Sequence, residues 1–228
     1  MTARGKLSAC GSIPPISHCL PALPDSPVAR EAVDYVRSSE STPVANHSMR
    51  TYLFAALLAE HEGLQAGTDF DTDLLFFACV LHDIGASQSA PGKHRFEVEG
   101  ADMAAEFLTR HGFNRSEVDA VWEAIALHTS PGIAERRGPL AYLTRGGVGV
   151  DFGISADFVT DMQGEAAHLR YPRLNMAATL VDDIVRHAAR SPEAAARFTI
   201  AGELTRERGQ TGAPTTLELA AQTSRWGA

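Results

Sequence analysis

The stretch Leu74-Leu75-Phe76-Phe77-Ala78-Cys79-Val80-Leu81-His82-Asp83-Ile84-Gly85 decides the fold, because an unbroken apolar run ends in two polar side chains and a glycine. Residues 74–81 predict a helix that is buried on most sides, and Gly85 is typical of a helix end. A helix end presents free carbonyls and the negative pole of the dipole, which favour a cation. His82 and Asp83 supply suitable ligand types. Adjacent helical residues point about 100° apart, so these two could share an ion only beyond the last turn.

On either side of this stretch the sequence reads as helix after helix, with no sustained alternation of apolar and polar residues and no internal repeat. Further helices are expected at residues 26–39, 43–63, 96–111, 116–130 and 180–188, and from Ser191-Pro192 onward. A glycine-rich passage, 146–153, interrupts this pattern. We therefore predict an all-α helical bundle of about eight helices around a metal site.

Length and composition favour one domain with a sizeable core, since the chain has 228 residues of which 44% are hydrophobic. We expect a flexible N-terminal leader at 1–24, the domain at 25–208 and a loosely packed tail at 209–228. The proline-rich leader contains Leu7-Ser8-Ala9-Cys10, which looks like a lipoprotein cleavage site. Only six residues precede it, which is too few for a signal peptide.

The charge and cysteine content restrict the partners and the compartment. A net charge of −8 argues against nucleic acid and against an anionic membrane surface, which leaves small-molecule or protein partners. No run of eighteen apolar residues is present, so no membrane span is expected. Three irregularly spaced cysteines suit neither a disulfide framework nor a zinc site, and they predict a reducing, cytoplasmic location. A homo-oligomer is left open.

Four residues of metal-ligand type stand where a helix starts, stops or is interrupted by glycine. They are His47, the pair His82-Asp83, and Asp151. Together they form a mixed nitrogen and oxygen set that suits a hard or borderline divalent ion. A single inward histidine is more often a core residue than a ligand, so it is the combination that suggests a site. His128 falls on the apolar face of its helix and therefore also points inward.

These residues carry a resemblance to a known family. His47, then His82-Asp83-Ile84-Gly85, then Asp151 match the H…HD…D pattern of the HD-domain metal-dependent hydrolases, an all-α family in which the four residues bind the metal. Other stretches resemble its cyanamide hydratase-like branch. They are residues 46–50, 95–101, 124–130 and 149–151. The resemblance covers roughly residues 25–187.

The resemblance implies one divalent metal held by His47, His82, Asp83 and Asp151, with zinc favoured and Fe²⁺, Mn²⁺ or Ni²⁺ as alternatives. The metal would activate water for addition to a small nitrile-like substrate, as in the conversion of cyanamide to urea. Asp83 is then a catalytic residue as well as a ligand. His128 is a candidate proton shuttle or substrate hydrogen-bond partner, with a core histidine bonded to a backbone carbonyl as the alternative.

Two further residues are candidate substrate contacts. Phe96 could form an apolar wall, although an ordinary core position is the simpler interpretation. Asn46 could orient a substrate, although a helix cap is the simpler one.

Two rival functions remain open at the level of sequence. One is a phosphohydrolase acting on a nucleotide or another phosphate ester, with His128 as a ligand of a second ion. The basic residues near the site in sequence are Lys93-His94-Arg95 and Arg50, and Arg50 could instead be a structural ion-pair partner. The other rival is a metal-stabilised binding module without enzymatic activity.

Overall fold

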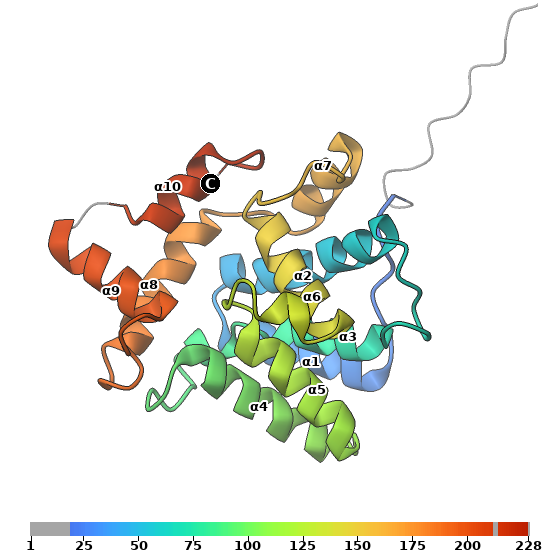
Figure 1. The fold of residues 1–228 in the computed structure, drawn as a ribbon, viewed down its shortest axis with the longest axis horizontal. Helices are drawn as coiled ribbons and strands as arrows, with labels where there is room; N and C mark the ends of the chain where they lie inside the picture. Colours follow the sequence, from blue (N-terminus) through green and yellow to red (C-terminus); the bar gives the residue numbers. More distant parts are fainter. Residues whose placement is uncertain (1–18, 212–213, 228) are drawn as a thin grey trace, which may run out of the picture.

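The computed structural model describes residues 19–211 and 214–227, and over these residues it contains ten α-helices and no strand. The prediction of an all-α fold is confirmed (Figure 1). The helices are α1 (Pro27–Ser39), α2 (Thr42–His61), α3 (Thr72–Leu81), α4 (Phe96–Arg110), α5 (Arg115–Leu127), α6 (Pro139–Asp151), α7 (Asp161–Arg170), α8 (Met176–Ala188), α9 (Ile200–Thr211) and α10 (Thr216–Thr223). Two short 3₁₀ helices, Ile84–Ala86 and Ala134–Arg136, complete the set.

Helix α3 lies at the centre of the bundle and packs against α1, α2, α4, α5 and α6. Every residue from Leu75 to Leu81 is fully buried, as expected of a helix that is apolar on all sides. The side chain of Asp71 caps its first turn by accepting a hydrogen bond from the Leu74 amide. The helix ends at Leu81, and the chain turns into the 3₁₀ helix, so His82 and Asp83 lie at the junction.

Gly85 is required at this junction by the close approach of α4. A Cβ atom placed there would lie 1.9 Å from the carbonyl oxygen of Phe96 and 2.4 Å from the amide nitrogen of Gly100. Both are backbone atoms, so neither can move aside as a flexible side chain could. The glycine after the histidine-aspartate pair therefore lets α4 pack directly against the turn that carries the pair.

The first part of the glycine-rich passage is helical, which differs from the expected interruption, and the helix ends within the passage at Asp151. Residues 146–149 lie within α6, and Gly147 faces α2. A Cβ atom on Gly147 would lie only 2.3 Å from the carbonyl oxygen of Thr51. The glycine thus permits the close packing of α2 and α6, and this packing compensates for the low helix propensity of glycine.

The helices α8, α9 and α10 form a second layer with its own apolar cluster, seen to one side of the bundle in Figure 1. Helix α9 begins at Ile200, so the prediction of a helix starting at Ser191-Pro192 is wrong. The chain forms only turns there, and the left-handed backbone of Phe198, with φ of 64°, separates them from α9. Helix α7 was not expected from the sequence.

The C-terminal segment is well packed, so the prediction of a loose tail is wrong for the residues that the structure describes. The indole ring of Trp226 stacks on Phe54 of α2 with ring centroids 5.8 Å apart, and its Nε1 donates to the carbonyl of Val150 at 2.6 Å. Gly164 leaves room for the indole, because a Cβ there would meet it at 2.6 Å. A single aromatic residue with both an apolar face and a donor thus anchors the segment.

At the other end, residues 1–18 of the predicted leader lie outside the described residues. Leu20 and Leu23 pack against the main core, and Tyr52 donates a hydrogen bond to the carbonyl of Ala22 at 3.2 Å. The packed part of the chain therefore begins before residue 25. Within the described segments no helix is both long and apolar enough to cross a membrane.

Candidate metal centre

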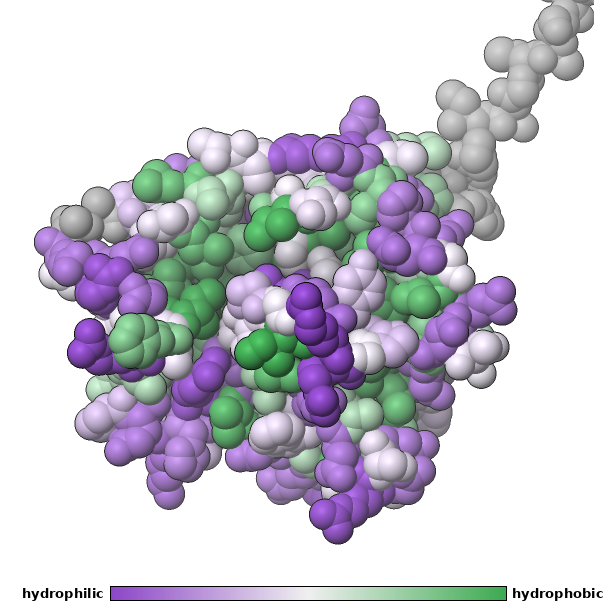
Figure 2. Space-filling view, viewed as in Figure 1, coloured by the Kyte–Doolittle hydropathy of each residue, from purple (hydrophilic) through white to green (hydrophobic). Residues whose placement is uncertain are grey.

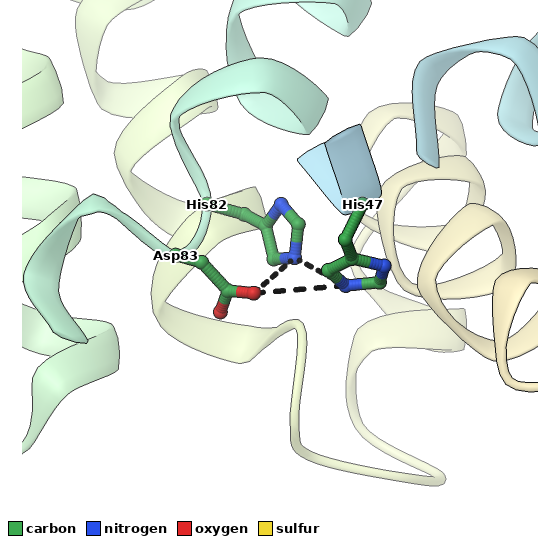
Figure 3. A group of neighbouring side chains, drawn as sticks. All are labelled: His47, His82 and Asp83. Carbon is green, nitrogen blue, oxygen red and sulfur yellow. Dashed lines mark hydrogen bonds and ion pairs between the residues drawn. The ribbon is translucent and has the colours of Figure 1, made fainter. Parts of the chain in front are cut away.

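Three of the predicted ligands converge in the interior: His47 from α2, and His82 and Asp83 from the end of α3 (Figure 3). Their ligand atoms all lie within 4.8 Å of one another. Nε2 of His82 is 3.1 Å from Asp83 Oδ2, and Nε2 of His47 is 3.6 Å from the same oxygen. The two Nε2 atoms are 3.2 Å apart. All three residues are buried, so this group could hold a metal ion.

The contact made by Nδ1 of each histidine determines that its Nε2 faces the centre of the group. Nδ1 of His82 lies 2.7 Å from the carbonyl three residues earlier, and Nδ1 of His128 lies 2.6 Å from the corresponding carbonyl of its own helix. A carbonyl only accepts hydrogen bonds, so both Nδ1 atoms carry a proton. Nδ1 of His47 is held 2.6 Å from a carboxylate oxygen of Asp151. The Nε2 atoms are thereby left to face a common point, as in metal sites whose histidines are oriented from behind.

The electrostatics of the group favour a positive charge at its centre. Burial alone would raise the pKa of Asp83, but the adjacent His82 outweighs it and holds that pKa far below the ordinary value. Burial likewise opposes protonation of His82, yet Asp83 raises its pKa, whereas burial lowers the pKa of His47. Oδ2 of Asp83 is buried and makes no hydrogen bond in the described residues. An ionised carboxylate without a hydrogen-bond donor, facing two imidazoles, fits a divalent cation.

Asp151 is not part of this group, which differs from the expected fourth ligand. Its two carboxylate oxygens are taken by Arg50, with Nε to Oδ1 at 2.6 Å and Nη2 to Oδ2 at 2.8 Å, and by His47 Nδ1. Arg173 adds a contact of 3.3 Å to Oδ1 and donates to the Asp151 carbonyl at 2.8 Å. Arg50 and His47 together hold the pKa of Asp151 far below its ordinary value against the effect of burial. In this arrangement Asp151 orients His47 and neutralises Arg50.

His128 lies beside the group rather than in the core alone. Its Nε2 is 3.7 Å from Asp83 Oδ1, and its ring is 4.9 Å from that of His82 in an edge-on arrangement. Burial, with a contribution from His82, lowers the pKa of His128 to about 4. The imidazole is therefore neutral near pH 7, with a free Nε2 lone pair directed at the site. His128 thus makes the backbone hydrogen bond expected of a core histidine, and it also lies beside the metal group.

A cavity of about 560 Å³ connects this group to the surface. His47, His82, Asp83, Phe96 and His128 line its buried end, while exposed residues such as His61, Glu62 and Glu135 line its mouth. Between them the wall is mostly apolar and is built from both layers of the fold. Its apolar members are Leu58, Val148, Val150, Phe152, Ile154, Phe158, Leu180, Ile184, Ile200 and Leu217. Figure 2 shows apolar side chains gathered in the hollow between the C-terminal helices and the rest of the molecule.

A second cavity, of about 410 Å³, also reaches Asp83 but has a polar lining. Serines surround it together with Glu40 and Asp183. Burial and the nearby Asp83 raise the pKa of Glu40 well above its ordinary value. Asp83 thus stands between an apolar cavity and a polar one.

A model of the HD-domain family matches residues 44–218, which is well over half of the chain. The chain belongs to the HD-domain family. This is a family of metal-dependent hydrolases with a helical fold, and the His47, His82 and Asp83 group is the part of this HD domain that could hold the metal.

Comparison with curated proteins gives partial similarity to two enzymes. The cyanamide hydratases DDI2 and DDI3 of Saccharomyces cerevisiae are each 31% identical to the chain over 108 residues, or 46% of this chain and 47% of either relative. An uncharacterized protein of Clostridium beijerinckii is 23% identical over 82 residues, or 36% of this chain and 52% of that protein. The chain therefore spans about half the length of the curated relatives it matches.

The two remaining site candidates differ in where the HD domain places them. Phe96 is the first residue of α4, is buried and lines the cavity, with its ring 5.7 Å from that of His128. Asn46 is not among the described residues that line either cavity, and its Nδ2 donates to the carbonyl of Pro172 at 2.8 Å. Nor does Asn46 cap α2, because Ser41 is the residue before the first turn. Asn46 instead ties α2 to the loop before α8.

Two acidic residues of α4 support the site region, and no sequence pattern indicates it. Glu97 is fully buried and accepts from Thr129 Oγ1 at 2.6 Å, so it holds the residue that follows His128. Glu99 is buried and accepts from the backbone amides of Gly92, Lys93 and His94 at 2.6–2.8 Å. The turn at Pro91-Gly92 is a sequence signal for a loop that needs such a partner, but it does not say which carboxylate supplies it.

Proposed function

We propose that this HD domain is a metal-dependent enzyme that adds water to a small nitrile-like carbon, in the manner of cyanamide hydration to urea. The observation that supports it most is the placement of the His47, His82 and Asp83 group at the closed end of a largely apolar cavity, with neutral His128 beside it. The partial similarity to two cyanamide hydratases supports the same reaction class.

The proposed roles follow from the contacts of each side chain. His47, His82 and Asp83 would hold one divalent ion, for which zinc suits the two imidazoles and one carboxylate, with Fe²⁺, Mn²⁺ and Ni²⁺ as alternatives. Such an ion supplies Lewis acidity, which lowers the pKa of water and polarises the nitrile. His128, with its Nε2 free, accepts a proton from water and returns it to the nitrile nitrogen. Asp151 acts through His47 by fixing its ring.

The charge of the cavity supports a neutral small-molecule substrate. Among the residues that the structure describes, Arg145 is the one lysine or arginine that lines it, and Arg145 is already paired with Glu135 at 2.8 Å. Glu62 and Asp83 add negative charge to the same lining. A polyanion would be repelled by the negative charge of this lining. Part of its own charge would then be left without a partner in an apolar site.

The basic triplet Lys93-His94-Arg95 does not compensate for this. Glu99 holds the backbone of Lys93 and His94, His187 Nε2 contacts the His94 carbonyl at 2.9 Å, and Arg95 pairs with Glu97 at 2.7 Å. None of the three is among the described residues that line the cavity. The triplet is thus held by other partners and does not contribute to the cavity lining, which disfavours the phosphohydrolase alternative.

The test combines metal analysis with parallel assays on cyanamide, small nitriles and a panel of nucleotides. We expect about one metal per chain, urea formation from cyanamide, and no nucleotide turnover. Asp83→Ala should lose metal and activity together. His128→Ala should keep the metal and lose rate by about 10²–10⁴-fold, the range for a general base. Asp157→Ala, an exposed position outside the lining, is the control.

Each rival has its own signature in the same experiment. Two metals per chain with turnover of a nucleotide and none of cyanamide would replace the hydratase by a phosphohydrolase. Bound metal with no turnover of any substrate would leave a metal-stabilised binding module. Metal loss in His128→Ala as complete as in Asp83→Ala would make His128 a ligand.

A further inference from the structure

The cavity is much larger than the smallest substrate of the proposed reaction would need. Cyanamide has three heavy atoms, which corresponds to a volume on the order of 100 Å³ or less, judged from the ~30 Å³ that each water takes in the liquid. The cavity holds about 560 Å³. That value lies within the range of ~300–1,000 Å³ that is usual for sites of much larger organic ligands.

The apolar wall begins at the metal group itself. The ring of Phe152 lies 5.4 Å from that of His47, and the ring of Phe96 lies 5.7 Å from that of His128. Both phenylalanines are buried. A substrate whose reacting carbon lies at the metal group would therefore meet apolar side chains with its very next atoms.

The wall continues outward on both layers of the fold. Leu58 of α2 and Val148 of α6 lie on one side, while Leu180 and Ile184 of α8 and Ile200 of α9 lie on the other. Charged side chains that line the cavity away from the metal group, Glu62, Glu135 and Arg145, sit at or near its mouth.

We propose that the substrate of this site is a nitrile of the form R–C≡N in which R is an apolar alkyl or aryl group that lies along the wall formed by α2, α6, α8 and α9. The inference rests on the proposed function. In the reaction, the oxygen of water bonds to the nitrile carbon and the two π bonds between carbon and nitrogen break. Both protons of water end on nitrogen, so the product is the amide R–C(=O)–NH₂.

The test measures binding of a linear series of alkanenitriles, from acetonitrile to hexanenitrile, to the zinc-loaded protein by isothermal titration calorimetry. Burial of each methylene contributes ~0.8 kcal/mol, so the dissociation constant should fall about fourfold per added carbon. The outer wall is then tested with Ile200→Trp, which fills the cavity from α9. This variant should bind hexanenitrile at least about tenfold more weakly than the wild type and acetonitrile equally well.

Gln210→Trp places the same side chain on the exposed side of α9 and should bind the series like the wild type. Dissociation constants that do not change with chain length, or that rise with it, would overturn the inference whatever the behaviour of the variants. Turnover of the same compounds is followed separately. If cyanamide is hydrated but nitrile binding does not depend on chain length, the proposed function stands and the apolar substrate is rejected. If binding depends on chain length but no nitrile is hydrated, the proposed function is rejected, and with it the substrate role, leaving only an apolar binding wall.

Discussion

Replacement of Gly147 by alanine tests whether the close packing of α2 on α6 holds the metal group together. The new Cβ would lie 2.3 Å from the carbonyl oxygen of Thr51 and 2.9 Å from the Cβ of Ala55. Ordinary contact starts at 3.4 Å, so the two helices must separate by about 1 Å. Such overpacking costs about 1–3 kcal/mol, while the better helix propensity of alanine returns up to about 1 kcal/mol. Because both colliding atoms are rigid, we expect a net loss of about 2 kcal/mol.

Gly149, two residues further along α6, is the matched control. A Cβ atom there would meet Ile154 at 3.7 Å, an ordinary contact, so Gly149→Ala should gain about 0.5–1 kcal/mol from helix propensity alone. For a chain of this size 1 kcal/mol changes the melting temperature by about 2–4 °C. Gly147→Ala should therefore melt about 4–8 °C below the wild type, and Gly149→Ala a few degrees above it.

The same pair of variants separates stability from site geometry. His47 lies on α2 and its partner Asp151 on α6, so helix separation in Gly147→Ala should also lengthen their 2.6 Å contact. Metal affinity, measured by competition with a chelator on folded protein, should fall about 10–100-fold in Gly147→Ala, the usual effect of losing a partner behind a ligand, and not in Gly149→Ala. Equal melting temperatures and equal metal affinities for the two variants would refute this reasoning.

Three further predictions address other contacts. Asp151→Asn leaves Arg50 buried with a weakened partner and should cost about 3 kcal/mol in urea denaturation, and an unchanged midpoint would show that the pair is not needed. Trp226→Phe removes the indole hydrogen bond and should lower the free energy of unfolding by about 1 kcal/mol. Trp226→Ala also removes the ring stack and should lower it by about 3 kcal/mol, so equal losses in the two variants would contradict the stacking role. Burial lowers the pKa of His168 to about 4, so between pH 6.5 and 4 the unfolded chain binds a proton that the folded one does not, and acidification over that range should destabilise the protein. His168→Phe should reduce the fall in melting temperature over this range. The difference should correspond to no more than about 2 kcal/mol, since the partly exposed ring is screened by solvent. An identical pH profile for the variant and the wild type would count against the lowered pKa of His168.

The centre of the fold was predictable because its signals are local. An apolar run that ends at His82, Asp83 and Gly85 indicates both a buried helix and a polar site at its end, and the structure contains both. The position of His128 on the inner face of its helix follows from the spacing of its apolar neighbours.

The parts that sequence reasoning missed depend on contacts between residues far apart in the chain. Asp151 has the residue type of a ligand, but its position is set by Arg50 and Arg173, which no local pattern connects to it. Gly147 reads as a helix breaker until the neighbouring helix that needs its missing side chain is known. Glu99 reads as a solvated acid until the loop that it binds is in place.

The contact between Trp226 and Val150 bears on the order in which the protein is assembled. The indole donates to the backbone directly before Asp151, and the two residues of this hydrogen bond are 76 positions apart in the chain. During synthesis the residues of the metal group emerge first, and α6 reaches its final support only after residue 226 has been added. A nascent chain that ends before Trp226 would hold His47 against a helix whose last turn is not yet anchored. The segment after α10 therefore supports the helix turn that carries Asp151, the residue that orients His47.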